Sequence, residues 1–223
     1  MITDDPGTPG NGKWEVNVAY NTERSPGVIE TQVPDFDINY GVGDRIELTV
    51  EFPWLFTSTV GQSRKQGAGD TLFGLKYRFV DLGDDKLQVS TYPQYTFNTL
   101  AQSVHAGLLE PDANIFLPFE ASETVGPLEL NADAGLAFHR NEPNEWTYGL
   151  AVGHLFRQGL ELVGEYRSDR VLDSDEDQQL FNFGIRAPIR AGVTFIGAYG
   201  LPLGHVPVGE RQWLGYAGLQ FTF

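Results

Sequence analysis

Twelve segments of the chain alternate apolar and polar residues with a period of two, and this pattern constrains the fold more than any other feature. Successive side chains of a β-strand point to opposite faces, so each segment predicts a strand with one apolar and one polar face. Clusters of Gly, Pro, Asn and Asp separate the segments. They cover residues 13–22, 29–40, 45–56, 69–80, 86–97, 112–121, 128–139, 146–156, 159–167, 179–189, 193–201 and 211–223. The chain therefore predicts an all-β fold with essentially no helix.

The connections between these segments alternate in length. Short turns are expected at residues 41–44, 81–85, 123–127, 157–159 and 190–192, and longer, polar or proline-rich connections at 23–28, 57–68, 98–111, 140–145, 168–178 and 202–210. Two short turns have the form Arg-x-Gly, in which the glycine accepts a left-handed backbone. An even number of strands with one trimmed and one elaborated rim is typical of outer-membrane barrels, whose trimmed rim is periplasmic. Both ends of the chain are then expected on the periplasmic side.

The two faces of these segments differ in chemistry. In residues 45–56, Leu48, Phe52 and Trp54 lie on one face, and Glu47 and Glu51 lie on the other. Twelve strands enclose more space than the roughly eight whose side chains fill a barrel, so an apolar interior would have to hold a large ligand. We therefore expect the apolar face to meet lipid and the polar face to line a lumen. A strand of ten residues, tilted by about 40° from the barrel axis, spans roughly 26 Å along that axis. This length matches an apolar band of about 25 Å.

Aromatic residues of the apolar face gather near both rims. Trp54, Phe73 and Trp213 belong to the larger set near the long-loop rim, and Trp14 and Tyr40 belong to the smaller set near the short-turn rim. Rings with an apolar body and a polar edge favour the lipid headgroup level. Two such belts predict a transmembrane barrel.

The amino-acid composition excludes several other classes of protein. No apolar run approaches eighteen residues, so no transmembrane helix is expected. The formal net charge of −15 argues against nucleic-acid binding, and the lack of cysteine excludes disulfides and thiolate metal sites. The first residues show no basic segment followed by an apolar one, so no signal peptide is expected. A mature exported chain with an added methionine is the favoured interpretation, and a cytoplasmic protein is the alternative.

The last eleven residues form an amphipathic segment that ends on Phe223. A terminal aromatic on such a strand resembles the closing strand of bacterial outer-membrane barrels, which the barrel-insertion machinery reads. The edge strand of a soluble β-protein is the alternative for this segment taken alone. The twelve-strand pattern favours the membrane barrel.

A more specific resemblance comes from short motifs near the N-terminus and in the fourth segment. Residues 3–10 (TDDPGTPG) followed by 12–15 (GKWE), and residues 67–70 (GAGD) leading into 74–77 (GLKY), resemble outer-membrane proteins of the MetA-pathway phenol-degradation family, often labelled transporters. The motifs are confined to these two regions, although the expected architecture covers most of the chain. The resemblance implies an outer-membrane barrel and an involvement with aromatic compounds.

The predicted inner face is rich in charge. An ion-pair network that braces the barrel is one interpretation, and a charged constriction that filters solutes is the other. The excess of acid predicts a preference for cations, which conflicts with aromatic acids as solutes. The residues predicted to line the lumen are Lys13, Glu15, Arg45, Glu47, Glu51, Lys76, Arg78, Glu129, Asp133, Glu161, Glu165 and Arg186.

No catalytic constellation is visible. None of the predicted strands pairs a serine with His105, His139, His154 or His205, so no catalytic residue, metal or cofactor is expected. A lipid-modifying enzyme would need a serine or aspartate within hydrogen-bond reach of His139. The acidic run at residues 173–177 offers carboxylates for calcium, but a solvated loop is the favoured interpretation because it lacks the spacing of a calcium loop.

The sequence thus predicts an all-β, 12-stranded antiparallel up-and-down transmembrane β-barrel in the bacterial outer membrane. Residues 1–12 are expected to form an N-terminal periplasmic segment, which either enters the lumen as a partial plug or stays a disordered tail, and residues 13–223 form the barrel. The expected function is a porin-like channel for small solutes, aromatic compounds among them. The alternative is a closed structural or adhesive barrel whose extracellular loops bind a partner. The expected partners are outer-membrane lipids, a small-molecule solute and the insertion machinery, with no nucleic acid and a monomeric state.

Overall fold

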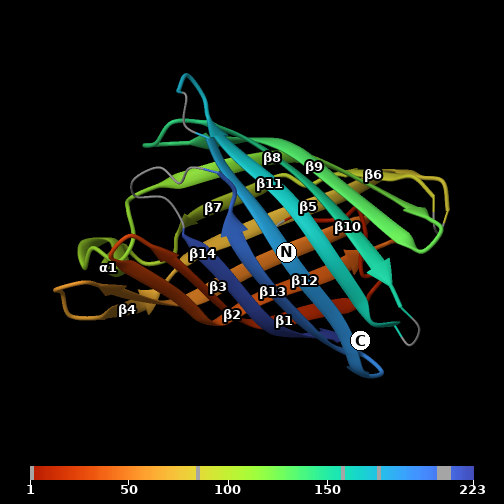
Figure 1. Cartoon of the computed structure of the whole chain (residues 1–223), viewed down its shortest axis with the longest axis horizontal. Helices are drawn as coiled ribbons and strands as arrows, with labels where there is room; N and C mark the ends of the chain where they lie inside the picture. The colour runs from red at the N-terminus through yellow and green to blue at the C-terminus, as the bar shows by residue number, and fades with distance from the viewer. Residues whose placement is uncertain (1–2, 84–85, 157–158, 175–176, 205–211) are drawn as a thin grey trace.

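The protein forms one closed β-barrel (Figure 1). The computed structural model describes residues 3–83, 86–156, 159–174, 177–204 and 212–223. Every pair of neighbouring strands is antiparallel, and the first and last strands pair with each other. The prediction of a closed 12-stranded antiparallel barrel is confirmed. No helix among the described residues is long and apolar enough to cross a membrane.

Two of the barrel strands are interrupted, so the described part of the wall consists of fourteen labelled strand segments. They are β1 (Trp14–Ser25), β2 (Val28–Val42), β3 (Ile46–Thr59), β4 (Lys65–Ala68), β5 (Asp70–Asp81), β6 (Gln88–Thr91), β7 (Gln94–Asn98), β8 (Ala113–Val125), β9 (Leu128–His139), β10 (Glu145–Leu155), β11 (Glu161–Val171), β12 (Asp177–Arg190), β13 (Val193–Pro202) and β14 (Trp213–Thr222). A short helix, α1 (Ala101–His105), lies between β7 and β8. Because β4 continues into β5 and β6 into β7, the labelled segments make twelve barrel strands.

Proline and glycine explain the two interrupted strands. The break between β4 and β5 falls at Gly69, whose N–H donates to the carbonyl of Pro53 at 2.9 Å. A Cβ on Gly69 would lie 2.7 Å from the Pro53 ring, so only glycine fits there. The break between β6 and β7 falls at Tyr92 and Pro93. Proline has no N–H to donate to a ladder, so regular pairing stops at this point.

The closing strand pairs as the sequence predicts. Glu15 lies opposite Thr222 in the β1–β14 ladder, and the backbones of Trp14 and Phe223 exchange two hydrogen bonds, of 2.8 and 3.0 Å. Gln220 is buried on the inner side. Both ends of the barrel wall therefore lie at the short-turn rim.

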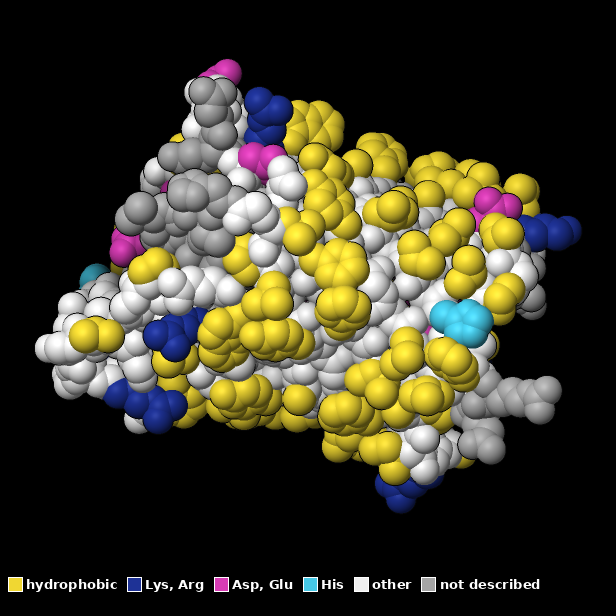
Figure 2. Space-filling view, in the orientation of Figure 1, with side chains coloured by type: hydrophobic (Ala, Val, Ile, Leu, Met, Phe, Trp, Pro, Cys, Tyr) yellow, Lys and Arg dark blue, Asp and Glu magenta, His cyan; other side chains and the backbone are white. Residues whose placement is uncertain are grey.

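The outside of the barrel is apolar and the inside is polar, the reverse of a soluble protein. Figure 2 shows hydrophobic side chains over the flank and charged ones mainly at the two ends. Trp54 and Phe73 are 43% and 48% exposed, whereas Glu47 and Lys76 are 7% and 3% exposed. Burial of charged groups with exposure of large apolar ones is stable only where lipid surrounds the barrel and polar groups line its interior.

Aromatic pairs lie at both levels where the sequence predicts belts. Trp14 and Tyr40 pack with ring centroids 4.6 Å apart near the short-turn rim. Tyr199 and Trp213 lie 6.2 Å apart near the opposite rim. Both pairs belong to the exterior, as the period-two pattern requires.

Some connections are shorter than predicted. The prediction of a long connection at residues 23–28 is wrong. Strands β1 and β2 pair as far as Ser25 and Val28, which leaves only Pro26 and Gly27 in the turn. The connection expected at 57–68 shortens in the same way, since β3 pairs with β4. Gly192 has a φ of 72°, the left-handed backbone expected in its turn. In the other Arg-x-Gly turn, residues 157–158 lie outside the described residues.

Candidate functional site: the barrel lumen

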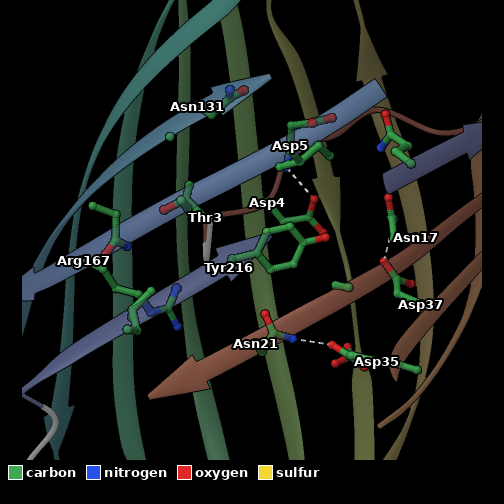
Figure 3. A pocket seen from close by; sticks show the side chains of 18 of the residues that line it. Thr3, Asp4, Asp5, Asn17, Asn21, Asp35, Asp37, Asn131, Arg167 and Tyr216 are labelled. Atoms are coloured by element: carbon green, nitrogen blue, oxygen red, sulfur yellow. Dashed lines mark hydrogen bonds between the residues drawn. The ribbon is translucent and has the colours of Figure 1, made fainter. Parts of the chain in front are cut away.

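A cavity of about 1060 Å³ runs along the inside of the barrel (Figure 3). Its lining includes Glu23 and Glu145 at the long-loop end of β1 and β10. It also includes Glu129 and Gln220, near the short-turn ends of β9 and β14. The cavity therefore reaches toward both rims.

The cavity is polar enough to require water. Several lining residues, among them Asn17, Asn131 and Thr147, have a buried side-chain oxygen with no protein partner in the part of the chain that is described. A buried polar atom without a partner costs free energy comparable to a lost hydrogen bond. These atoms therefore favour a hydrated lumen over a dry one.

One wall of the lumen is acidic. Asn17 and Asn39 each donate to one carboxylate oxygen of Asp37 at 2.9 Å, and Asn21 donates to Asp35 (Figure 3). Within the described residues, neither aspartate forms an ion pair with a lysine or arginine. These amides stabilise the carboxylates without cancelling their charge. The acids of this wall, on β1, β2 and β3, are Glu15, Asp35, Asp37, Glu47 and Glu51.

Lys76 of β5 is the centre of a buried charge cluster. Its Nζ lies 3.0 Å from Asp4, 3.7 Å from Glu120 and 3.9 Å from Glu47. It also lies 4.7 Å from the centre of the Tyr92 ring, where a cation is attracted to the aromatic face. Because Lys76 is only 3% exposed, these partners replace the water that its ammonium would otherwise bind.

The N-terminal segment lies inside the lumen. The N–H of Thr3 donates to Glu165 of β11, and Lys76 of β5 donates to the carbonyl of Asp5 at 2.6 Å. Four barrel strands separate β5 from β11 on one side and six on the other, so these anchors lie on nearly opposite walls. Figure 3 shows Thr3, Asp4 and Asp5 among the strands that surround them. Of the two sequence-based alternatives, the lumenal segment is the one observed.

Arginines lie on the wall formed by β11 and β12. Arg167 pairs with Asp169 at 3.0 Å and with Asp133 at 3.4 Å. Arg186 lies 3.9 Å from Glu161. Both guanidinium groups thus have acidic neighbours of their own, and acidic side chains outnumber basic ones among the described residues that line the cavity.

The structure places the predicted lumen residues in three groups. Seven line the cavity: Glu15, Glu47, Glu51, Lys76, Glu129, Glu161 and Arg186. Asp133 and Glu165 are buried on the inner side, against Arg167 and Thr3. Arg78 pairs with Asp81 at the short-turn rim, and Lys13 and Arg45 are exposed there, because all three lie near strand ends where the wall gives way to turns.

Several lumen residues carry no charge and were missed for that reason. Tyr92, Phe116 and Tyr216 place rings along the cavity, and Asn182 lies fully buried against Glu165. Their positions follow from the period-two register, which was the available signal.

The histidines and the acidic run have different surroundings. His105 lies on α1, His154 packs 4.4 Å from the Phe156 ring, and His205 lies outside the described residues. Residues 175–176 of the acidic run also lie outside them.

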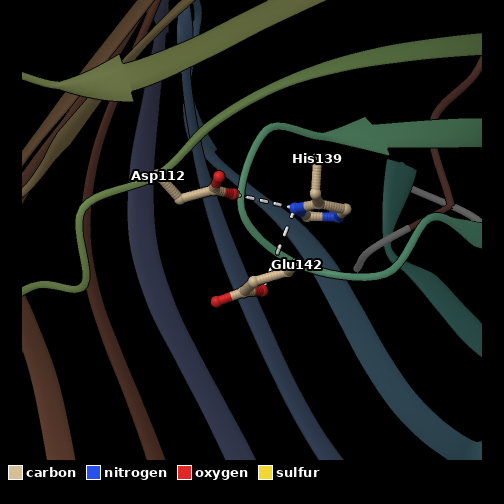
Figure 4. Close-up of side chains that lie close together, drawn as sticks. All are labelled: Asp112, His139 and Glu142. Carbon is tan, nitrogen blue, oxygen red and sulfur yellow. Dashed lines mark hydrogen bonds and ion pairs between the residues drawn. The ribbon is translucent and has the colours of Figure 1, made fainter.

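At the long-loop mouth, His139 meets two carboxylates. Its Nδ1 lies 2.9 Å from Asp112 and 3.9 Å from Glu142 (Figure 4). Partial burial acts to raise the pKa of Asp112, but hydrogen bonds with the His139 ring and the backbone N–H groups of Ala113 and Asn141 outweigh it and hold that pKa below its usual value. Asp112 is therefore a carboxylate at neutral pH.

Comparison with known proteins places this fold among membrane barrels. No family model matches the chain, and no curated protein matches it. The COG4313 outer membrane channel from Pseudomonas putida F1 is similar over the whole of both chains, with a TM-score of 0.75 and 12% identity. The fold is that of outer-membrane β-barrels. The KdgM porin in complex with disordered oligogalacturonate has a TM-score of 0.66 and 12% identity over 93% of this chain and 99% of that one. The NanC porin has a TM-score of 0.67 and 10% identity over 92% and 98%.

These similarities support the predicted localisation in the bacterial outer membrane. At 10 to 12% identity they establish the shared barrel architecture, and the solutes of those proteins do not carry over. The resemblance to the phenol-degradation family rests on the short motifs of residues 3–15 and 67–77.

Proposed function

We propose that the protein is an outer-membrane channel for small solutes, with a narrow, charged lumen as the path. The observation that carries this proposal is the polar cavity whose lining extends from Glu145 near one rim to Glu129 near the other. A barrel that served only as a scaffold would gain stability by filling this space with packed side chains. Open polar space along the barrel axis is instead what a diffusing solute needs.

The charge distribution favours cations and neutral polar solutes. Lys76, Arg167 and Arg186 are paired with acids, whereas Asp35 and Asp37 are held only by amides. Rings of acidic side chains make pores selective for cations. Solutes with a carboxylate would meet repulsion on this wall.

A more specific form of this proposal is that the solutes are small aromatic compounds. Two observations support aromatic solutes: the resemblance to the phenol-degradation family, and the rings of Tyr92, Phe116 and Tyr216 in the cavity lining. An uncharged aromatic solute can contact these rings without approaching the acidic wall as an anion. Neutral phenols therefore fit better than aromatic acids.

Single-channel recording tests the channel. Purified, folded protein in planar bilayers is expected to give discrete conductance steps, and Glu47→Gln is expected to change the step size because Glu47 lines the cavity. Arg78→Gln, at the rim, is the matched variant with the smaller expected effect. Silent bilayers for the wild type and both variants, with heat-modifiable gel mobility showing folded barrels, would contradict the channel.

A closed structural or adhesive barrel is the second candidate. The observation in its favour is the N-terminal segment, which bridges the lumen between Lys76 and Glu165. This candidate predicts silent bilayers and loss of partner binding when the loop within residues 168–178 is shortened. Conductance steps would argue against it.

We propose that the protein has no catalytic role. Asp112 does lie within hydrogen-bond reach of His139, at 2.9 Å. Among the described residues, no serine or threonine hydroxyl is hydrogen-bonded to that ring, so the pair lacks the nucleophile that a hydrolase requires. We expect a monomer whose C-terminal strand is read by the insertion machinery.

A further inference from the structure

We propose that Asp112, His139 and Glu142 bind a divalent metal ion of the zinc class at the long-loop mouth of the barrel. One ligand atom from each residue lies within 4.8 Å of the other two. One imidazole nitrogen and two carboxylate oxygens are ligands that Zn²⁺ uses, with water completing the tetrahedron. Such a site would bind its ion whether or not the barrel conducts.

The distances suit a single ion. Ligand atoms held about 2.1 Å from a tetrahedral ion lie about 3.4 Å from one another. The two distances from His139 Nδ1, 2.9 Å to Asp112 and 3.9 Å to Glu142, fall on either side of that value. Shifts of less than about 1 Å in the side chains would bring all three atoms into coordination.

The ring nitrogen has more acceptors than it can satisfy. Nδ1 carries at most one hydrogen, yet two carboxylates converge on it from different parts of the chain (Figure 4). A proton can bond well to only one of these carboxylates. A metal ion in its place would bind Nδ1 and both carboxylates at once.

Backbone contacts orient the first two ligands. The N–H of Asn141 donates to Oδ1 of Asp112 at 3.1 Å, which leaves Oδ2 directed at the ring. The N–H of His139 donates to the side chain of Asn144, also at 3.1 Å. Outer contacts of this kind fix the direction of metal ligands. Glu142, with a side chain 53% exposed, remains free to close on the ion.

The position of the cluster also favours cations. His139 lines the cavity, and Glu145 and Asp169 line it at the same rim. Clustered acidic groups raise the local concentration of cations. A bound ion would join the chain before β8 to the connection between β9 and β10.

Calorimetric titration tests this site. Full-length folded protein in detergent micelles, treated with a chelator and dialysed, is expected to bind one Zn²⁺ saturably. His139→Gln and Glu142→Gln should each weaken binding at least about tenfold. His105→Gln removes another histidine, on α1, and should leave the affinity unchanged. Ca²⁺ should not compete at equal concentration, because it requires six to eight oxygen ligands.

Each outcome of this titration is informative. Absence of saturable Zn²⁺ binding, or an unchanged affinity in Glu142→Gln, would overturn the site and leave an ordinary Asp–His hydrogen bond. Equal competition by Ca²⁺ would also overturn it, because it would indicate diffuse attraction to acids. If His139→Gln fails to fold, Glu142→Gln decides, since its exposed side chain contributes little to the barrel.

Discussion

Deletion of residues 3–9 is expected to raise the single-channel conductance several-fold. This segment is anchored on nearly opposite walls, through Lys76 and Glu165, and its residues border the cavity along its length. The conductance of a narrow pore falls as its open cross-section shrinks, and the segment occupies part of the lumen. Recording the deletion variant and the wild type in the same planar bilayers measures the difference.

A point substitution provides an independent form of this test. A Cβ at Gly41 would lie 2.0 Å from the carbonyl oxygen of Gly10, so Gly41→Ala should displace the segment without removing it. Gly164→Ala is the matched control, because its Cβ would make only an ordinary contact of 3.6 Å. Conductance should rise in Gly41→Ala and stay unchanged in Gly164→Ala. Wild-type conductance in the deletion variant would show that the segment does not limit the pore.

Replacing Lys76 by methionine is expected to lower the free energy of unfolding by about 3–5 kcal/mol. The ammonium is almost fully buried and lies within 4 Å of the carboxylates of Asp4, Glu47 and Glu120. Methionine keeps most of the unbranched side chain but leaves these acids without their cation. Urea unfolding in lipid vesicles, followed by tryptophan fluorescence, measures the loss.

Two companion variants separate charge from packing. Arg186→Met removes a cation that is 42% exposed and 3.9 Å from Glu161, so it should cost less than about 1 kcal/mol. Adding Glu120→Gln to Lys76→Met should recover part of the lost stability, because it removes one uncompensated charge. A Lys76→Met barrel as stable as the wild type would show that water, and not the lysine, compensates these acids.

The barrel itself could be predicted because it follows from local periodicity. The alternation of Leu48 with Glu47 separates an apolar from a polar face, the strand count and the aromatic belts turn the apolar face to lipid, and the parity of the connections brings the last strand back to the first. These two rules place Glu15 and Thr222 on the same face of neighbouring strands, and the structure pairs them directly. Strand ends were less predictable, since β1 continues to Ser25 through the charged Glu23 and Arg24, where the apolar alternation has stopped.

The interior contacts could not be predicted because they join residues far apart in the chain. Asp4 and Lys76 are 72 residues apart, and Thr3 and Glu165 are 162 apart. The composition of residues 3–10 allows both a lumenal segment and a free tail. His139 and Asp112 meet only because β8 and β9 are neighbours whose ends bring two loops together. Such contacts depend on register and loop path, which periodicity does not encode.

The reversal potential of the wild-type channel under a KCl gradient tests the central claim most directly. We expect a potential of the sign that marks cation preference, because Asp35, Asp37 and Glu51 make one wall of the lumen acidic. The triple variant Asp35→Asn, Asp37→Asn, Glu51→Gln should move that potential toward zero. A potential that marks anion preference in the wild type, or the absence of any conductance from folded protein, would contradict an acidic conducting lumen.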